Sequence, residues 1–186
     1  VIDAIKLLRV VKMLKSSRIL DITDRDVSDI SREIRDTFGI QVIKMTSGEL
    51  NAYYEKADEA EARRIADKWI REALKVVEPT KDEIVRSARM YLALKRAMQD
   101  CDADALTIDC LNLCYGGKIP AYPCLALFQL NNEGSTGVCE ADLNSTITQL
   151  MMRYLTGRPG YVSDPVIDTA SNQIIYVPVS YTHLRA

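Results

Sequence analysis

The 186-residue sequence predicts an α/β protein, a Rossmann-like three-layer domain with a mainly parallel sheet, followed by the beginning of a second, C-terminal domain. Short apolar runs of strand length alternate with longer segments of helical periodicity, which is typical of β-α-β units. The run ALTIDCL (105–111) is largely apolar, as in a parallel strand that is buried on both faces. Right-handed crossover connections make a Rossmann-like sheet the default topology for this order of elements.

The first half of the chain alternates helices and strands. The expected elements are, in order, a helix over 2–15, a strand over 18–23, a helix from Asp26 to Phe38, a strand over 41–46, and helices over 47–56, 58–76 and 80–99. Asp26 is a typical N-cap residue, and Gly39 is a typical C-cap residue. Pro79-Thr80 marks the start of the last of these helices.

The second half continues the same alternation. Its expected elements are strands over 105–111, 136–141, 159–164 and 173–177, a short helix within 120–131, and a helix over 142–156. Gly157 and Pro159 interrupt the chain, so we expect a domain boundary there, with one domain over 1–155 and the start of another over 156–177.

Charge is concentrated in the first part of the chain. Residues 1–100 hold 38 charged side chains and residues 101–186 hold 12, so the few acids of the second part are candidates for chemistry. The net charge of −2 and the pI near 5.5 provide no basic surface, which argues against nucleic acid and anionic membrane as partners. We expect a cytoplasmic protein, because no apolar run or N-terminal signal pattern is present.

The five cysteines are irregularly spaced and lie mostly among apolar residues, which indicates reduced, packed thiols. A zinc site is the alternative, with Cys110 and Cys114 one turn apart on a helix. The absence of a CxxC pair and the presence of a single histidine argue against it.

Two acids of the second half follow strands. Glu140 ends the strand over 136–141, and Asp164 ends the one over 159–164. Ligands of parallel α/β sheets bind outside the carboxyl ends of the strands, and a separation of one helix plus one strand suits two neighbouring strand ends. Two carboxylates there would suit Mn²⁺ or Mg²⁺. The simpler interpretation is that Glu140 is a surface acid and that Asp164, before Pro165, forms an Asx turn.

Two other features have structural explanations. Asp142 is expected to be the N-cap of the helix over 143–156, with Asn144 in its first turn. Gly116-Gly117-Lys118 lacks the spacing of a phosphate-binding loop and is assigned no role.

The segment PAYPCLALFQLNNEGSTGVCEADLNSTITQLMMRYLTGRP (120–159), with its CEAD motif, helix and following strand that ends in Asp, resembles the L-fucose isomerase family. Residues 1–155 resemble most of the second, Rossmann-like domain of that family, and 156–177 resemble the beginning of its C-terminal domain. The chain would then be a fragment, without the first domain and most of the last one.

The resemblance implies a metal-dependent aldose–ketose isomerase that acts on a monosaccharide through an ene-diol. Glu140 and Asp164 would bind Mn²⁺ and would shuttle a proton between the first two carbons of the sugar. A histidine of the C-terminal domain would complete the metal ligands, and the full-length protein would be a homo-oligomer. No nicotinamide or flavin is needed.

The sequence departs from the family pattern at its end, where residues 178–186 resemble a translated sequencing adapter and His183 is therefore left out of the site. With two carboxylates and no imidazole, the fragment alone is expected to be inactive. The alternative function is a non-catalytic sugar-binding α/β module. A dinucleotide-dependent oxidoreductase is disfavoured, because no glycine-rich fingerprint follows an early strand.

Overall fold

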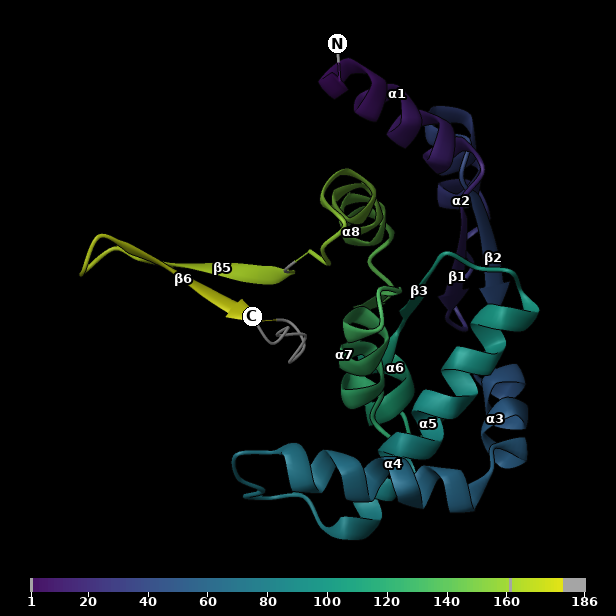
Figure 1. Ribbon diagram of the computed structural model, residues 1–186, viewed down its shortest axis with the longest axis vertical. Helices are drawn as coiled ribbons and strands as arrows, with labels where there is room; N and C mark the ends of the chain where they lie inside the picture. Colours follow the sequence, from purple (N-terminus) through teal and green to yellow (C-terminus); the bar gives the residue numbers. More distant parts are fainter. Residues whose placement is uncertain (1, 161, 179–186) are drawn as a thin grey trace.

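The computed structural model describes residues 2–160 and 162–178; His183 and the other residues of the predicted non-native tail from 179 on lie outside this part. A four-stranded sheet lies between helices, and a separate two-stranded hairpin follows it (Figure 1). The strands are β1 (Arg18–Ile22), β2 (Gln41–Met45), β3 (Ala105–Ile108), β4 (Thr136–Cys139), β5 (Ser163–Asp168) and β6 (Gln173–Pro178). The helices are α1 (Ile2–Lys15), α2 (Ser28–Phe38), α3 (Ser47–Lys56), α4 (Glu59–Glu72), α5 (Lys81–Asp100), α6 (Cys110–Tyr115), α7 (Cys124–Asn132) and α8 (Leu143–Thr156).

The four-stranded sheet is parallel throughout and has the order β2-β1-β3-β4. Chain order therefore runs outward from β1 to β2 on one side and from β3 to β4 on the other. All residues of β3 and β4 are buried, as expected for parallel strands covered on both faces. The predicted Rossmann-like α/β sheet is confirmed.

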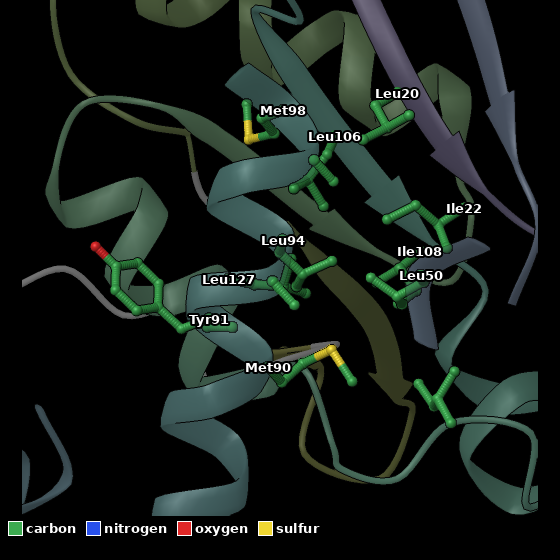
Figure 2. Close-up of a cluster of buried hydrophobic side chains, with 14 of the residues drawn as sticks. Leu20, Ile22, Leu50, Met90, Tyr91, Leu94, Met98, Leu106, Ile108 and Leu127 are labelled. Carbon is green, nitrogen blue, oxygen red and sulfur yellow. The ribbon is translucent and has the colours of Figure 1, made fainter. Parts of the chain in front are cut away.

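One face of the sheet is covered by α3, α5, α6 and α7. Alternate residues of the central strands point to this face, and they pack against long apolar side chains of the helices (Figure 2). The buried residues labelled there are Leu20, Ile22, Leu50, Met90, Tyr91, Leu94, Met98, Leu106, Ile108 and Leu127. Gly137 of β4 lets α7 approach closely, because a Cβ at this position would lie 3.2 Å from the Leu127 side chain.

The other face is covered by α1, α2 and α8. Ile19 of β1 and Ala105 of β3 alternate with the residues that point to the first face. They pack on this second face against Leu14, Ile34 and Leu150. The same alternation places Asp21 on this second face, two residues beyond Ile19 on β1. The second layer of helices therefore covers the face of β1 that carries the carboxyl group of Asp21.

Helix ends follow from local residues, with one correction. Thr80 caps α5 in a capping box with Glu83, as the Pro79-Thr80 signal predicts. Gly39 ends α2 with φ +77°. The prediction that Asp26 is the N-cap is wrong: α2 begins at Ser28, and Asp26 lies one residue before the cap position, where its carboxylate accepts from the Ser28 N–H at 3.0 Å.

The strand expected over 105–111 is too long. β3 ends at Ile108, and α6 begins at Cys110, where apolar residues continue because one side of this short helix is buried at Leu113. A continuous apolar run does not distinguish a buried strand from the buried helix that follows it.

The last two strands form an antiparallel hairpin of their own, β5-β6, which projects away from the parallel sheet (Figure 1). The strand expected over 159–164 is wrong in its bounds, since β5 begins at Ser163. The domain division at 155/156 stays a prediction. None of the helices in the described part is long and apolar enough to cross a membrane.

Candidate functional site at the carboxyl edge of the sheet

The order β2-β1-β3-β4 gives the sheet a topological switch point between β1 and β3, whose next strands lie on opposite sides. Open α/β sheets bind ligands outside the carboxyl ends of the strands at such a point. Here the residues that follow β1 and β3 are polar and lie side by side, since Asp109 N–H donates to the Ile22 carbonyl at 2.9 Å. The switch point is therefore the place to examine for a site.

A hydrogen-bonded network joins the two strand ends. Thr23 Oγ1 donates to Asp109 Oδ2 at 3.1 Å, and Arg25 Nε lies 3.0 Å from the same oxygen. Asn112 Nδ2, from the first turn of α6, donates to Asp109 Oδ1 at 2.9 Å. Asp109 is 2% exposed, so this buried carboxylate is compensated by a charge and by donors on both oxygens.

Asp21 differs from Asp109, because it is fully buried and neither of its oxygens has a hydrogen-bond partner among the described residues. Burial raises the pKa of Asp21 to about 6. Two charges have smaller effects: Arg25 lowers this pKa and Asp109 raises it. Native proteins rarely leave a buried carboxyl group without a donor, so this residue needs an explanation.

Glu140 directly follows β4, so its predicted place at a strand end is confirmed while its role stays a prediction. Glu140 and Ala141 have φ angles of +66° and +51°, a left-handed conformation that is unusual for residues with a side chain. The turn is held by Ala141 N–H, which donates to the Ile108 carbonyl at 3.0 Å. This non-glycine strain lies at the same edge of the sheet as the Asp109 network.

Asp164 is not in the parallel sheet. It is the second residue of β5, in the separate hairpin, and its side chain lies outside the described part of the structure. The prediction that Glu140 and Asp164 lie at the ends of neighbouring strands is wrong, because β5 pairs with β6 and with no other strand in the described part of the chain. Metal binding by the two residues stays a prediction.

Asp142 is the N-cap of α8, as predicted, and accepts from the Ser145 N–H at 3.0 Å and from the Ser145 hydroxyl. Asn144 lies in the first turn of that helix. The carboxylate of Asp142 therefore already has a structural role in starting α8.

None of the five cysteines, all of which are described, forms a disulfide. A hydrogen bond with Cys139 and the backbone N–H of Glu140 lower the pKa of Cys110 to about 7, against the opposing effect of burial. Burial raises the pKa of Cys114 to about 12. Across residues 2–160 and 162–178, no three His, Cys, Asp or Glu side chains group closely enough to hold a metal ion, which gives the zinc alternative no support.

Sequence reasoning missed the residues of the switch point. Asp21, Thr23 and Asp109 fall within predicted apolar strands, and Arg25 falls between a predicted strand and a predicted helix. The available signal was a single acid inside an otherwise apolar parallel strand, since an acid there has a high desolvation cost unless something binds it.

The chain is distantly similar to the sulfoquinovose isomerases of Priestia aryabhattai and of Priestia megaterium (strain ATCC 12872 / QMB1551). With each of them it shares 27% identity over 97 residues, which cover 51% of this chain and 22% of the relative. The matched stretch thus spans about a fifth of the length of these relatives. No protein-family model matches the chain. This weak similarity points to sugar isomerases in general and does not single out the L-fucose isomerases.

Proposed function

We propose that this chain is part of a metal-dependent sugar isomerase that interconverts an aldose and a ketose. The observation that carries the proposal is the similarity to the two sulfoquinovose isomerases. The position of Glu140 in a strained turn at the carboxyl edge of the sheet supports it, because α/β enzymes place reactive groups at this edge.

In this proposal, Glu140 and Asp164 would hold a divalent cation such as Mn²⁺. Carboxylate oxygens are the ligands that hard cations prefer, so the donor type fits. When bound, the cation would polarise the two oxygens of the sugar between which the carbonyl moves. A further ligand would come from outside the described part of the chain, and the full protein would be a homo-oligomer.

The proposed reaction requires proton transfer by groups of the protein. An aldose becomes a ketose when one proton leaves C2 and one is added at C1, while a hydroxyl proton passes from O2 to O1. No electrons are gained or lost overall, so neither nicotinamide nor flavin is required. A carboxylate such as Glu140 would take the proton from C2 and return it to C1.

The first test is Mn²⁺ binding to the 186-residue chain, measured by calorimetry for the wild type, Glu140→Gln and Asp164→Asn. Asp168→Asn is the matched control, because Asp168 lies on the same strand and accepts from the N–H groups of Ala170 and Ser171 in the hairpin turn. We expect weak binding that both site variants abolish and that the control retains. Equal binding by all four proteins would refute the assigned ligands.

The second test uses the complete protein encoded by the full-length gene, with a panel of aldoses and ketoses in deuterated water. Mn²⁺-dependent interconversion with solvent deuterium incorporation at C1 or C2, lost in Glu140→Gln, would support the proposal. Turnover that persists in that variant would remove Glu140 from the mechanism.

A non-catalytic sugar-binding module is the second candidate. The observation that favours it is the position of Asp164 in a hairpin outside the parallel sheet, away from the strand ends where Glu140 lies. A full-length protein that binds sugars and turns over none of them, with or without Mn²⁺, would support this candidate.

A further inference from the structure

Asp21 is one of the residues around a pocket of about 250 Å³ at the carboxyl edge of the sheet. The pocket lies between the beginnings of α2 and α8, and its other lining residues are Arg25, Asp26, Val27, Ile30 and residues 141–144. The pocket is of a size for a small organic molecule.

Asp21 is the acid of this pocket that has no donor. Asp26 accepts from both the N–H and the hydroxyl of Ser28, and Asp142 accepts from Ser145. Asp21 accepts from no group of the described residues, although both of its oxygens are buried. A buried acceptor without a partner destabilises the fold, so a bound group that donates a hydrogen bond to it would offset this cost.

The lining of the pocket selects the class of ligand. Three acids and one arginine give it an excess of negative charge, which opposes phosphate, sulfate and other anions. A bare metal cation finds no group of three ligating side chains in residues 2–160 and 162–178. The mouth offers both donors, on Arg25 and the Asn144 amide, and acceptors, on Asp142 and Asn144. Hydroxyl groups, which donate and accept, match such a mixed surface.

We propose that this pocket binds a small neutral polyol and that Asp21 accepts a hydrogen bond from one of its hydroxyl groups. The apolar side chains of Val27, Ile30 and Leu143 contact the carbon backbone of the polyol. Both oxygens of Asp21 lie beneath the pocket surface, so a hydroxyl reaches them after a side chain at the mouth moves. Arg25 is suited to this movement, because its side chain is 55% exposed.

The proposal does not rest on the isomerase reaction, because it is tested by binding in the absence of metal and turnover. The probe is sorbitol, added to the ¹⁵N-labelled 186-residue chain while backbone amide shifts are recorded. We expect saturable shifts at the amides of Asp21, Ala141 and Asn144. Shifts that do not saturate, or that map to other parts of the chain, would overturn the proposal even before any variant is made.

Variants then test the role of Asp21. Asp21→Leu removes a hydrogen bond to a charged acceptor and is expected to weaken sorbitol binding by about tenfold or more. Asp21→Asn keeps the shape and is expected to weaken it in the same direction, which covers the case in which the leucine variant does not fold. Asp36→Asn, an exposed acid on α2, removes the same charge and is expected to bind like the wild type.

Two further probes separate the polyol from other ligands. Inorganic phosphate and Mg²⁺ are expected to give no saturable shifts at the three amides. Saturable shifts with either probe at those amides, at concentrations where sorbitol gives none, would replace the polyol by an anion or a cation and reject the proposal.

Discussion

Asp21 lies inside β1 and Asp109 directly follows β3, the strand next to β1, and their surroundings differ in one respect. Asp109 has Thr23, Arg25 and Asn112 as partners, whereas Asp21 has no hydrogen-bond partner in residues 2–160 and 162–178. The position of each acid relative to the end of its strand explains the difference. Asp109 lies beyond the last residue of β3, whereas Asp21 lies inside β1. One acid is within reach of loop side chains and the other is held under α2 and α8.

This placement predicts how stability depends on pH. The pKa of Asp21 is raised from 3.8 to about 6, so the folded chain binds more protons than the unfolded chain between these values. The free energy of unfolding should therefore fall as pH rises from about 4 to about 6, by about 3 kcal/mol if the whole shift acts. Asp21→Asn should lack this slope, which urea unfolding at a series of pH values would measure.

The surrounding charges do not change the sign of that prediction. Arg25 and Lys44 lower the pKa of Asp21 and Asp109 raises it, and burial outweighs them. Asp36→Asn is the control, since this exposed acid should leave the wild-type slope in place. An identical slope in Asp21→Asn and the wild type would show that Asp21 ionises in the folded chain at its ordinary pKa.

Cysteine reactivity gives a second prediction for single residues. Hydrogen bonds from the Cys139 thiol and the Glu140 N–H lower the pKa of Cys110 to about 7, and partial burial raises the pKa of Cys114 to about 12. Iodoacetamide at pH 7.5 should therefore modify Cys110 well before Cys114, because the thiolate is the reactive form. Mass spectrometry of tryptic peptides after timed exposure measures both rates, and faster labelling of Cys114 would contradict the structure.

For helices and strands, most of the fold follows from apolar periodicity and capping residues. Thr80 and Gly39 specify helix ends through a side-chain oxygen and a left-handed backbone, and both signals are local in sequence. Where the signal is not local, the prediction is wrong. The end of β3 at Ile108 depends on which neighbour pairs with it, and the apolar residues from Cys110 on are compatible with either structure.

The site was less predictable than the fold for the same reason. The position of Glu140 after a strand depends on local sequence, and it could be predicted. The network around Asp109 depends on Thr23, which is 86 residues away, so no pattern in either segment specifies it. The partner strand of β5 is likewise a matter of tertiary pairing, which left Asp164 assigned to the wrong sheet.

The cap of α5 can be tested as a unit. Thr80 Oγ1 accepts from the Glu83 N–H at 3.3 Å, and Glu83 accepts in return from the Thr80 N–H at 2.7 Å. Thr80→Ala should lower the free energy of unfolding by about 1 kcal/mol, while Thr80→Ser, which keeps the oxygen, should lose much less. Urea unfolding of the three proteins measures this; equal losses would mean that the hydroxyl does not cap the helix.

At the scale of the whole molecule, the chain consists of a layered α/β unit and a hairpin. The unit has apolar clusters on both faces of its sheet. The hairpin exposes apolar side chains instead, among them Ile167, Ile174 and Tyr176, and no helix shares a substantial surface with it in the described part of the chain. Stability should therefore reside in the layered unit.

Removal of the hairpin tests this division. A chain that ends at Gly160 keeps every residue of both apolar clusters, so its melting temperature should stay within a few degrees of that of the 186-residue chain. Differential scanning calorimetry of the two chains measures it. A fall of ten degrees or more would show that the hairpin helps to hold the layered unit together.

The central position of β1 also has a consequence for the kinetics of folding. β1 and β2 are close in sequence and can pair early, whereas β3 reaches β1 only after the loop of more than 80 residues between them has closed. Until then one edge of an apolar parallel strand has no partner and can pair with the same edge of another chain. Refolding from denaturant should therefore be slow, and its yield should fall as the protein concentration rises.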